Sequence, residues 1–336
     1  MKLREAISPD GGWYDDAGDY WFKSPAEEFA LAHNAICTSP RVSLAVIRVA
    51  GSEAEAFLQG QLITNLRKLD PARGSLSAWC TPQGRVSFLF HLIPEVNGYL
   101  LLVPESEAAR LVQRLKMFVL RAKVTVEDVS AQCAVIGLSV PRACARPPWV
   151  DALHAARNVI SGVTDELRAL CIDDFARFLV WGDTRPLLAW WRDCALPSMG
   201  DAAWRLLDIE QGYAEITGDA VNAFLPQQLN LDMLDALAFD KGCYPGQEIV
   251  ARLKYRGEVK SRLLRGRAHG EVPRGARLRT LGAAQSAGQI LSAVTLPSAE
   301  TELLAVVELS ALMVAPQVEG APLTQLQFEH PPYWNA

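Results

Sequence analysis

The chain has 336 residues, of which 50% are hydrophobic and 21% are charged, and its formal net charge is −5. This length exceeds a single ordinary core and predicts two or three domains of about 100 to 150 residues each. No stretch approaches the roughly 20 apolar residues that cross a bilayer, which excludes a membrane-spanning protein, and the net charge gives no general attraction to nucleic acid.

The cysteines indicate a reducing compartment, and the first residues do not resemble a targeting signal. The seven cysteines are scattered and contain no Cys-x-x-Cys pair, so neither a disulfide framework nor a structural zinc site is expected. The five histidines show no metal-binding spacing either. The first residues, MKLREAISPDGGWYDD, lack the apolar core of a secretory signal and carry acids that a mitochondrial presequence avoids. We therefore expect a cytoplasmic protein whose mature chain begins near Met1.

The first part of the chain predicts alternating strands and helices. Residues 1–35 are expected to form an extension with a short helix at 26–33. A β-branched strand follows at 42–49, and the capping box Ser52-x-x-Glu55 begins a helix. Hydrophobic patterning then predicts strands at 86–93 and 99–103, a helix at 106–119 and a strand at 123–129. The order strand, helix, two strands, helix, strand is typical of a ferredoxin-like unit.

The later part of the chain predicts a second α+β region and a C-terminal β domain. Strands are expected at 133–138 and 176–181, and helices at 165–170, 187–194 and 201–211. A loop is expected at 142–148, and residues 226–239 are expected to form a loop that runs into a short helix. After Tyr255, short β-prone pieces separated by glycines predict a small closed β-barrel at 256–328. The expected fold class is therefore α+β, with an extension at 1–35, α+β domains at 36–130 and 131–255, and a β-barrel domain at 256–336.

The most unusual passage is KGCYPGQEIVAR, from Lys241 to Arg252. Two glycines and a proline bend the backbone around Cys243, and a basic residue stands at each end. A cation close to Cys243 would favour the thiolate, which attacks electrophiles and binds metal. Free cysteines are also among the most buried residues, so a small packed side chain is the alternative interpretation of Cys243.

This passage resembles the K-G-C-Y-x-G-Q-E signature of the YgfZ family, a folate-binding branch of the glycine-cleavage T-protein superfamily. It matches at every fixed position: Lys241, Gly242, Cys243, Tyr244, Gly246, Gln247 and Glu248. The segments FLQGQLITN (57–65), DIEQGYAEI (208–216) and FLPQQLNLD (224–232) resemble further family motifs. The resemblance implies three domains in a ring around a central channel, with the two ferredoxin-like domains interleaved along the chain.

The resemblance also implies a reduced folate in that channel. Glu210 matches the carboxylate with which the wider superfamily holds the pteridine ring, and a carboxylate can accept two parallel hydrogen bonds from such a ring. The expected cofactor is tetrahydrofolate or a derivative, with or without a polyglutamyl tail. Without the family, Glu210 would be interpreted as a surface acid. Asp208 departs from the pattern, because many superfamily members have a basic residue there.

A second departure concerns catalysis. Aminomethyltransferases of the superfamily carry an acidic pair at the positions that Ser87 and Phe88 occupy here, and neither side chain can act as a carboxylate base. A classical aminomethyltransferase is therefore not expected, and whether the chain catalyses a reaction of another kind is left open.

Three functions are compatible with these residues. In the preferred one, a folate and the thiol of Cys243 at the channel rim support assembly or repair of iron–sulfur clusters in client enzymes. The family's clients include radical enzymes that methylthiolate tRNA, so any effect on tRNA modification would be indirect. The second function is folate-dependent aminomethyl transfer. The third is a scaffold without catalysis, in which ten Lys and Arg between Arg252 and Arg279 contact RNA or another partner. These basic residues are also typical of a solvated surface, and direct nucleic-acid binding is not expected.

Overall fold

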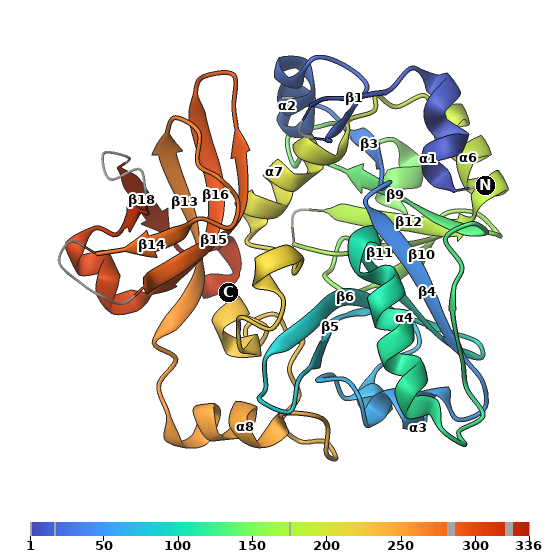
Figure 1. Cartoon of the computed structure of the whole chain (residues 1–336). Helices are drawn as coiled ribbons and strands as arrows, with labels where there is room; N and C mark the ends of the chain where they lie inside the picture. Colours follow the sequence, from blue (N-terminus) through green and yellow to red (C-terminus); the bar gives the residue numbers. More distant parts are fainter. Residues whose placement is uncertain (1, 17, 175, 281–285, 320–324, 336) are drawn as a thin grey trace. The chain divides into compact units, whose positions relative to one another are not determined.

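The computed structural model describes residues 2–16, 18–174, 176–280, 286–319 and 325–335. Helices and strands are mixed along the chain, as expected for an α+β protein (Figure 1). The chain divides into two compact units. Unit 1 comprises residues 1–59, 66–76 and 90–204, and unit 2 comprises residues 60–65, 77–89 and 205–336. Unit 2 therefore takes two short segments from the first hundred residues.

The first sheet of unit 1 is formed by five antiparallel strands in the order β10-β11-β12-β9-β3. Their bounds are β3 (Cys37–Pro40), β9 (Cys133–Ser139), β10 (Ile160–Gly162), β11 (Arg168–Cys171) and β12 (Arg177–Asp183). All seven residues of β9 are buried, and its sequence accordingly contains an almost continuous run of apolar residues. Helices α1 (Leu3–Ile7), α2 (Pro25–Asn34), α5 (Pro148–Asp151) and α6 (Thr184–Asp193) belong to the same unit.

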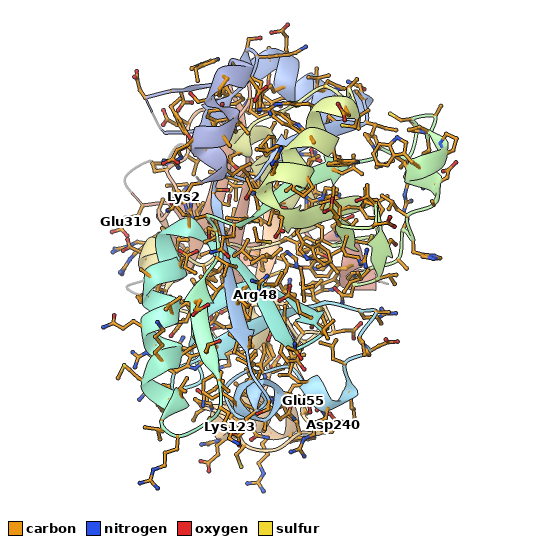
Figure 2. All side chains as sticks on the ribbon, turned by 90° about the vertical axis from the view of Figure 1, so that its right-hand side faces the viewer. Lys2, Arg48, Glu55, Lys123, Asp240 and Glu319 are labelled. Atoms are coloured by element: carbon orange, nitrogen blue, oxygen red, sulfur yellow. The ribbon has the colours of Figure 1, made fainter. Side chains whose placement is uncertain are left out.

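The second sheet has the strand order β5-β6-β7-β4-β8. Its strands are β4 (Leu44–Ala50), β5 (Ser75–Cys80), β6 (Val86–Glu95), β7 (Gly98–Pro104) and β8 (Thr125–Asp128), with helices α3 (Ala54–Gln59) and α4 (Glu105–Val119) between them. Helix α4 buries Ala108, Leu111 and Leu115, which recur at helical spacing on one face. On the same sheet Arg48, labelled in Figure 2, forms an ion pair of 3.0 Å with Glu95.

The sheet of unit 2 contains six strands in the order β17-β14-β15-β16-β13-β18, and it is visibly curved (Figure 1). The bounds are β13 (Ser261–His269), β14 (Arg277–Arg279), β15 (Ser286–Thr295), β16 (Glu300–Glu308), β17 (Gln317–Val318) and β18 (Leu326–Glu329). Its core contains Leu264, Ile290, Leu303 and Val307. Unit 2 also contains helix α8 (Gln247–Arg256) and the C-terminal part of α7 (Asp201–Gln211).

Most local predictions are confirmed, and one is wrong. The helix expected at 165–170 does not form, because residues 168–171 are strand β11, paired with β10 on one side and β12 on the other. The segment consists mainly of good helix formers, but hydrogen bonding to two neighbouring strands outweighs that preference. Helices α1, α5 and α8 and strands β3, β5 and β10 were not predicted.

Within the described parts of the chain, no helix combines the length and hydropathy that a membrane crossing needs. The same residues contain no cluster of three or more His, Cys, Asp or Glu side chains that could hold a metal ion. Two short hairpin strands, β1 (Trp13–Tyr14) and β2 (Tyr20–Trp21), precede α2.

Candidate functional site

The KGCYPGQE segment is the loop that leads into α8, and its turn depends on Gly246. Gly246 has a φ of 81° and precedes the first residue of α8. A Cβ atom at this position would lie 2.5 Å from the Cα of Gly84 and 2.5 Å from the Thr81 carbonyl oxygen. Gly84, in the turn between β5 and β6, also has a positive φ, 73°. The loop and this turn thus approach each other through two glycines, and only glycine fits that contact without strain.

Lys241 ties the same loop to a segment far away in the chain. Its ammonium donates hydrogen bonds to the carbonyl oxygens of Leu62, at 2.6 Å, and Thr64, at 2.8 Å. The same nitrogen lies 5.2 Å from the centre of the Tyr244 ring. Burial lowers the pKa of Lys241 to about 8. Two of the family-like motifs, 57–65 and 241–248, are therefore joined by the half-buried ammonium of Lys241.

The Leu62–Thr64 segment is itself held in place. The Thr64 hydroxyl lies 2.8 Å from the Ser77 hydroxyl and 3.0 Å from the Ala236 carbonyl oxygen. The N–H of Ala238 donates to the Ile63 carbonyl oxygen at 3.0 Å. The carbonyl groups that accept hydrogen bonds from the Lys241 ammonium thus belong to a segment that is itself anchored by hydrogen bonds. Asp240, which precedes Lys241, is exposed and is labelled in the lower part of Figure 2.

The signature residues divide into anchors and exposed groups. Tyr244 is 6% exposed, and burial raises the pKa of its hydroxyl. The Gln247 amide donates to the Lys241 carbonyl oxygen at 3.3 Å, which closes the loop. Gly242, Cys243, Glu248 and Arg252 are exposed. Lys241, Tyr244, Gly246 and Gln247 therefore shape the loop, and the others face solvent.

Cys243 differs from the other cysteines in its accessibility. All seven lie in the described part of the chain, and Cys243 is the one that is exposed. Cys144 and Cys194 are partly buried. Burial raises the pKa of four thiols to about 12, those of Cys37, Cys80, Cys133 and Cys171. The packed-hydrophobe interpretation of Cys243 is therefore wrong, because the bend of the loop presents this side chain to solvent.

The Lys241 ammonium is directed at the Leu62 and Thr64 carbonyls, so its clearest effect is on the position of the loop. That a basic residue activates the thiol stays a prediction.

Ser87 and Phe88 are both engaged in packing. The Ser87 hydroxyl is in short hydrogen-bond contact with Oδ1 of Asn222. Phe88 is 1% exposed and lies edge-to-face against Trp79, with ring centres 6.1 Å apart. The strand is further paired through the Val86 N–H, which donates to the Phe224 carbonyl oxygen at 2.8 Å. Neither position can supply an acid or a base from a side chain held in this way.

Glu210 lies in the last turn of α7, and its surroundings depend on the C-terminus of the chain. Glu210 is half-buried. The helix ends at Gln211, and the next residue, Gly212, has a φ of 74°. The carbonyl oxygen of Gly212 accepts a 2.9 Å hydrogen bond from the Tyr333 hydroxyl. That hydroxyl accepts a 3.1 Å hydrogen bond from the Asn230 amide, which also lies 2.9 Å from the Leu263 carbonyl oxygen. The end of α7 is thus fixed from two distant parts of unit 2.

Two of these supporting residues were not anticipated from the sequence. Asn230 is fully buried and has a φ of 59°, a conformation that asparagine adopts more readily than most residues. The sequence feature that could have identified Asn230 is its position within the family-like segment FLPQQLNLD. Tyr333 is buried near the C-terminus, and nothing in its local sequence indicates a contact with Gly212.

That Glu210 holds a pteridine stays a prediction. A carboxylate can accept two parallel hydrogen bonds from such a ring. Glu210 and Asp208 lie on the same turn of α7, and both are half-buried.

The chain is similar to several proteins named tRNA-modifying protein YgfZ. The protein from Colwellia psychrerythraea is 30% identical over 219 residues, which are 65% of this chain and 67% of the relative. The protein from Edwardsiella ictaluri is 32% identical over 237 residues, 66% and 69% of the two chains. The protein from an Enterobacter species is 31% identical over 238 residues, 65% and 68%. No protein-family model matches the chain.

The fold is similar to that of a solved structure over nearly its whole length. Aminomethyltransferase T of the glycine cleavage system from Bartonella henselae superposes with a TM-score of 0.77, covering 98% of this chain and 96% of the other. The two sequences are 14% identical, so the likeness is one of fold.

Proposed function

Because the chain belongs to the YgfZ family within the superfamily of aminomethyltransferase T, we propose that it is a tetrahydrofolate-binding protein that supports iron–sulfur enzymes. Its clients are enzymes whose clusters need assembly or repair, and among them are radical enzymes that modify tRNA. It acts in the cytoplasm on these enzymes and not on tRNA itself. In this proposal the chain forms three domains around a central channel, two of them ferredoxin-like and the third a closed β-barrel.

The observation that carries the proposal is the exposed thiol of Cys243 on an anchored loop. Four thiols are buried with a pKa of about 12, and such thiols are poor nucleophiles and poor metal ligands. Cys243 is accessible, and its loop is fixed by the Lys241 ammonium and by the Gly246 contact. An accessible thiol held in one place suits contact with a cluster or with a client protein.

The thiol is tested by replacing Cys243 with Ala and measuring the activity of an iron–sulfur enzyme in cells. We expect client activity to fall while the melting temperature of the variant stays unchanged. The matched control is Cys144→Ala, which removes a partly buried thiol at another place. Full client activity in the Cys243→Ala strain would contradict the proposal.

Glu210 is the residue that we propose for holding tetrahydrofolate, with Asp208 beside it. Bound tetrahydrofolate would supply a carrier for one-carbon units at its ring nitrogens. The carboxylate of Glu210 would accept hydrogen bonds from the pteridine and fix the orientation of the ring.

The test is an anaerobic calorimetric titration of tetrahydrofolate into the wild type, Glu210→Ala and, as a control, Glu248→Ala, which removes an exposed acid. Binding to the wild type and to Glu248→Ala, but not to Glu210→Ala, is expected. If the wild type does not bind, the folate part of the proposal is wrong, and a thiol-bearing scaffold remains.

A classical aminomethyltransferase reaction is disfavoured by the positions of Ser87 and Phe88. The Ser87 hydroxyl is hydrogen-bonded to Asn222, and the Phe88 ring packs against Trp79. Neither position therefore supplies a carboxylate base. We expect no tetrahydrofolate-dependent formation of methylenetetrahydrofolate from glycine-derived aminomethyl carriers. Clear steady-state turnover in that assay would favour the enzyme instead.

A further inference from the structure

Helix α8 presents an unusual surface directly after the exposed thiol. Among its ten residues, Val250 is the one that is fully buried. Ile249 is 43% exposed and Tyr255 is 69% exposed, both large apolar side chains in contact with solvent. Figure 1 shows α8 at the lower edge of the view. A helix that buries so little of its own surface leaves most of its side chains available to a partner.

Four of the exposed side chains of α8 lie on one side of the helix. Arg252 is three residues after Ile249 and is followed by Tyr255 and Arg256 at three and four residues, which places these side chains close together on a helix. Val250 points to the opposite side, into the protein. We call these four residues the α8 face.

The α8 face carries two positive charges, those of Arg252 and Arg256. Arg252 and Arg256 are exposed, and neither forms an ion pair with a described residue. Lys254, on the flank of the helix, lies 3.8 Å from the centre of the Phe239 ring. Glu248 and Glu258 are the nearest acids in the sequence. The helix thus has a local positive charge although the whole chain has a net charge of −5.

We propose that the α8 face is the docking surface for an acidic patch on the iron–sulfur client enzyme. This inference rests on the function proposed above. Arginine and tyrosine are the residues that most often dominate the binding energy of protein interfaces, and they surround an apolar Ile249 here. The loop with Cys243 leads directly into α8, so a client bound to this face has the thiol close by.

The composition favours a protein partner over RNA. Phosphate binding uses many cations and few aliphatic side chains. The α8 face has two arginines, an exposed Tyr255 and an exposed Ile249, and the acid Glu248 lies next to it in the first turn of the helix. A mixed surface of this kind matches an acidic protein patch with an apolar centre.

The test measures binding of the full-length protein to a purified radical tRNA methylthiotransferase with intact clusters. The variants are Arg252→Glu with Arg256→Glu, and separately Tyr255→Ala. The matched control is Lys116→Glu with Arg121→Glu, which reverses two exposed charges near the end of α4. Each α8 variant is expected to bind at least about tenfold more weakly, which corresponds to about 1.4 kcal/mol. The control should bind as the wild type does, and all variants should keep the wild-type melting temperature.

The outcomes separate this inference from the function on which it rests. If the α8 variants and the control bind the enzyme equally well, the docking surface is wrong, although the wild type can still support client activity. If the α8 variants instead lose binding to tRNA, measured in parallel at low salt, the surface is an RNA site and the inference is overturned. If the wild type neither binds nor supports the enzyme, both the docking surface and the proposed function fail.

Discussion

Replacing Lys241 with Met tests the central anchor of the signature loop. Methionine keeps much of the length and volume of the side chain but removes the ammonium. The carbonyl oxygens of Leu62 and Thr64 then lose donors at 2.6 and 2.8 Å. A buried acceptor left without a partner costs about 1–3 kcal/mol, and relief from burying a charge offsets part of this loss. We expect a net destabilisation of about 2 kcal/mol at pH 7, measured by urea unfolding.

The same substitution should alter how stability depends on pH. Burial lowers the pKa of Lys241 to about 8 in the folded chain, against 10.5 for an ordinary lysine. Between these values the unfolded chain binds more protons than the folded chain, so the contribution of Lys241 to stability rises with pH across this window. The slope is at most about 1.4 kcal/mol per pH unit. The Met variant lacks this contribution, because methionine does not titrate.

The assay is therefore a comparison of urea unfolding at intervals from pH 7 to pH 10 for both proteins. Contributions from other titrating groups largely cancel in the difference. The stability of the wild type relative to Lys241→Met should increase as the pH rises above 8. A difference that stays constant over this range would refute a buried ammonium at this site, and an unchanged stability at pH 7 would refute its role as an anchor.

Three further predictions concern single positions. Gly246→Ala should lower the melting temperature by several degrees, because the added Cβ would lie 2.5 Å from the Cα of Gly84. Gly242→Ala is the control and should change the melting temperature little, because its Cβ would meet nothing within 4 Å. Burial lowers the pKa of His91 to about 4, so the contribution of the neutral ring to stability is complete above pH 6.5 and is lost as the pH falls toward 4. The variant His91→Gln has no group that titrates in this range. In acid titrations followed by circular dichroism, it should therefore unfold at a lower pH than the wild type. Brief alkylation of the native protein at pH 7.5 should add one adduct, at Cys243, when followed by mass spectrometry, and rapid modification of a buried cysteine would contradict the assignment of exposure.

Local patterns predicted many elements well. The helices expected at 26–33, 106–119 and 201–211 correspond to α2, α4 and α7, within a residue or two at each end. In α2 the agreement has a clear local cause, since Pro25 is the first helical residue and the Ser24 N–H donates to the Glu27 carboxylate at 3.2 Å. Caps and apolar periodicity act over a few residues, so these helices could be predicted from adjacent positions.

The errors occur where pairing with other strands or a single backbone turn decides the conformation. Residues 168–171 form β11 because β10 and β12 pair with them. The strand expected at 176–181 corresponds to β12, but β10 was not predicted, and a local pattern does not show that residues 168–171 pair with both. Helix α8 begins inside the KGCYPGQE passage, where two glycines and a proline suggested a continuous bend. Gly246 instead ends the bend with a positive φ, and the helix starts at the next residue.

The sequence by itself determined the family, through the KGCYPGQE signature, and the absence of an acidic pair at Ser87 and Phe88. Tertiary structure alone decided what these residues contact. Lys241 lies 179 and 177 positions from the carbonyls that it binds, and Tyr333 lies 121 positions from Gly212. Exposure of Cys243, in contrast to the burial of four other thiols, likewise depends on how the folded chain covers each side chain. Such contacts cannot be predicted from neighbouring residues, because the partners meet only when the whole unit has folded.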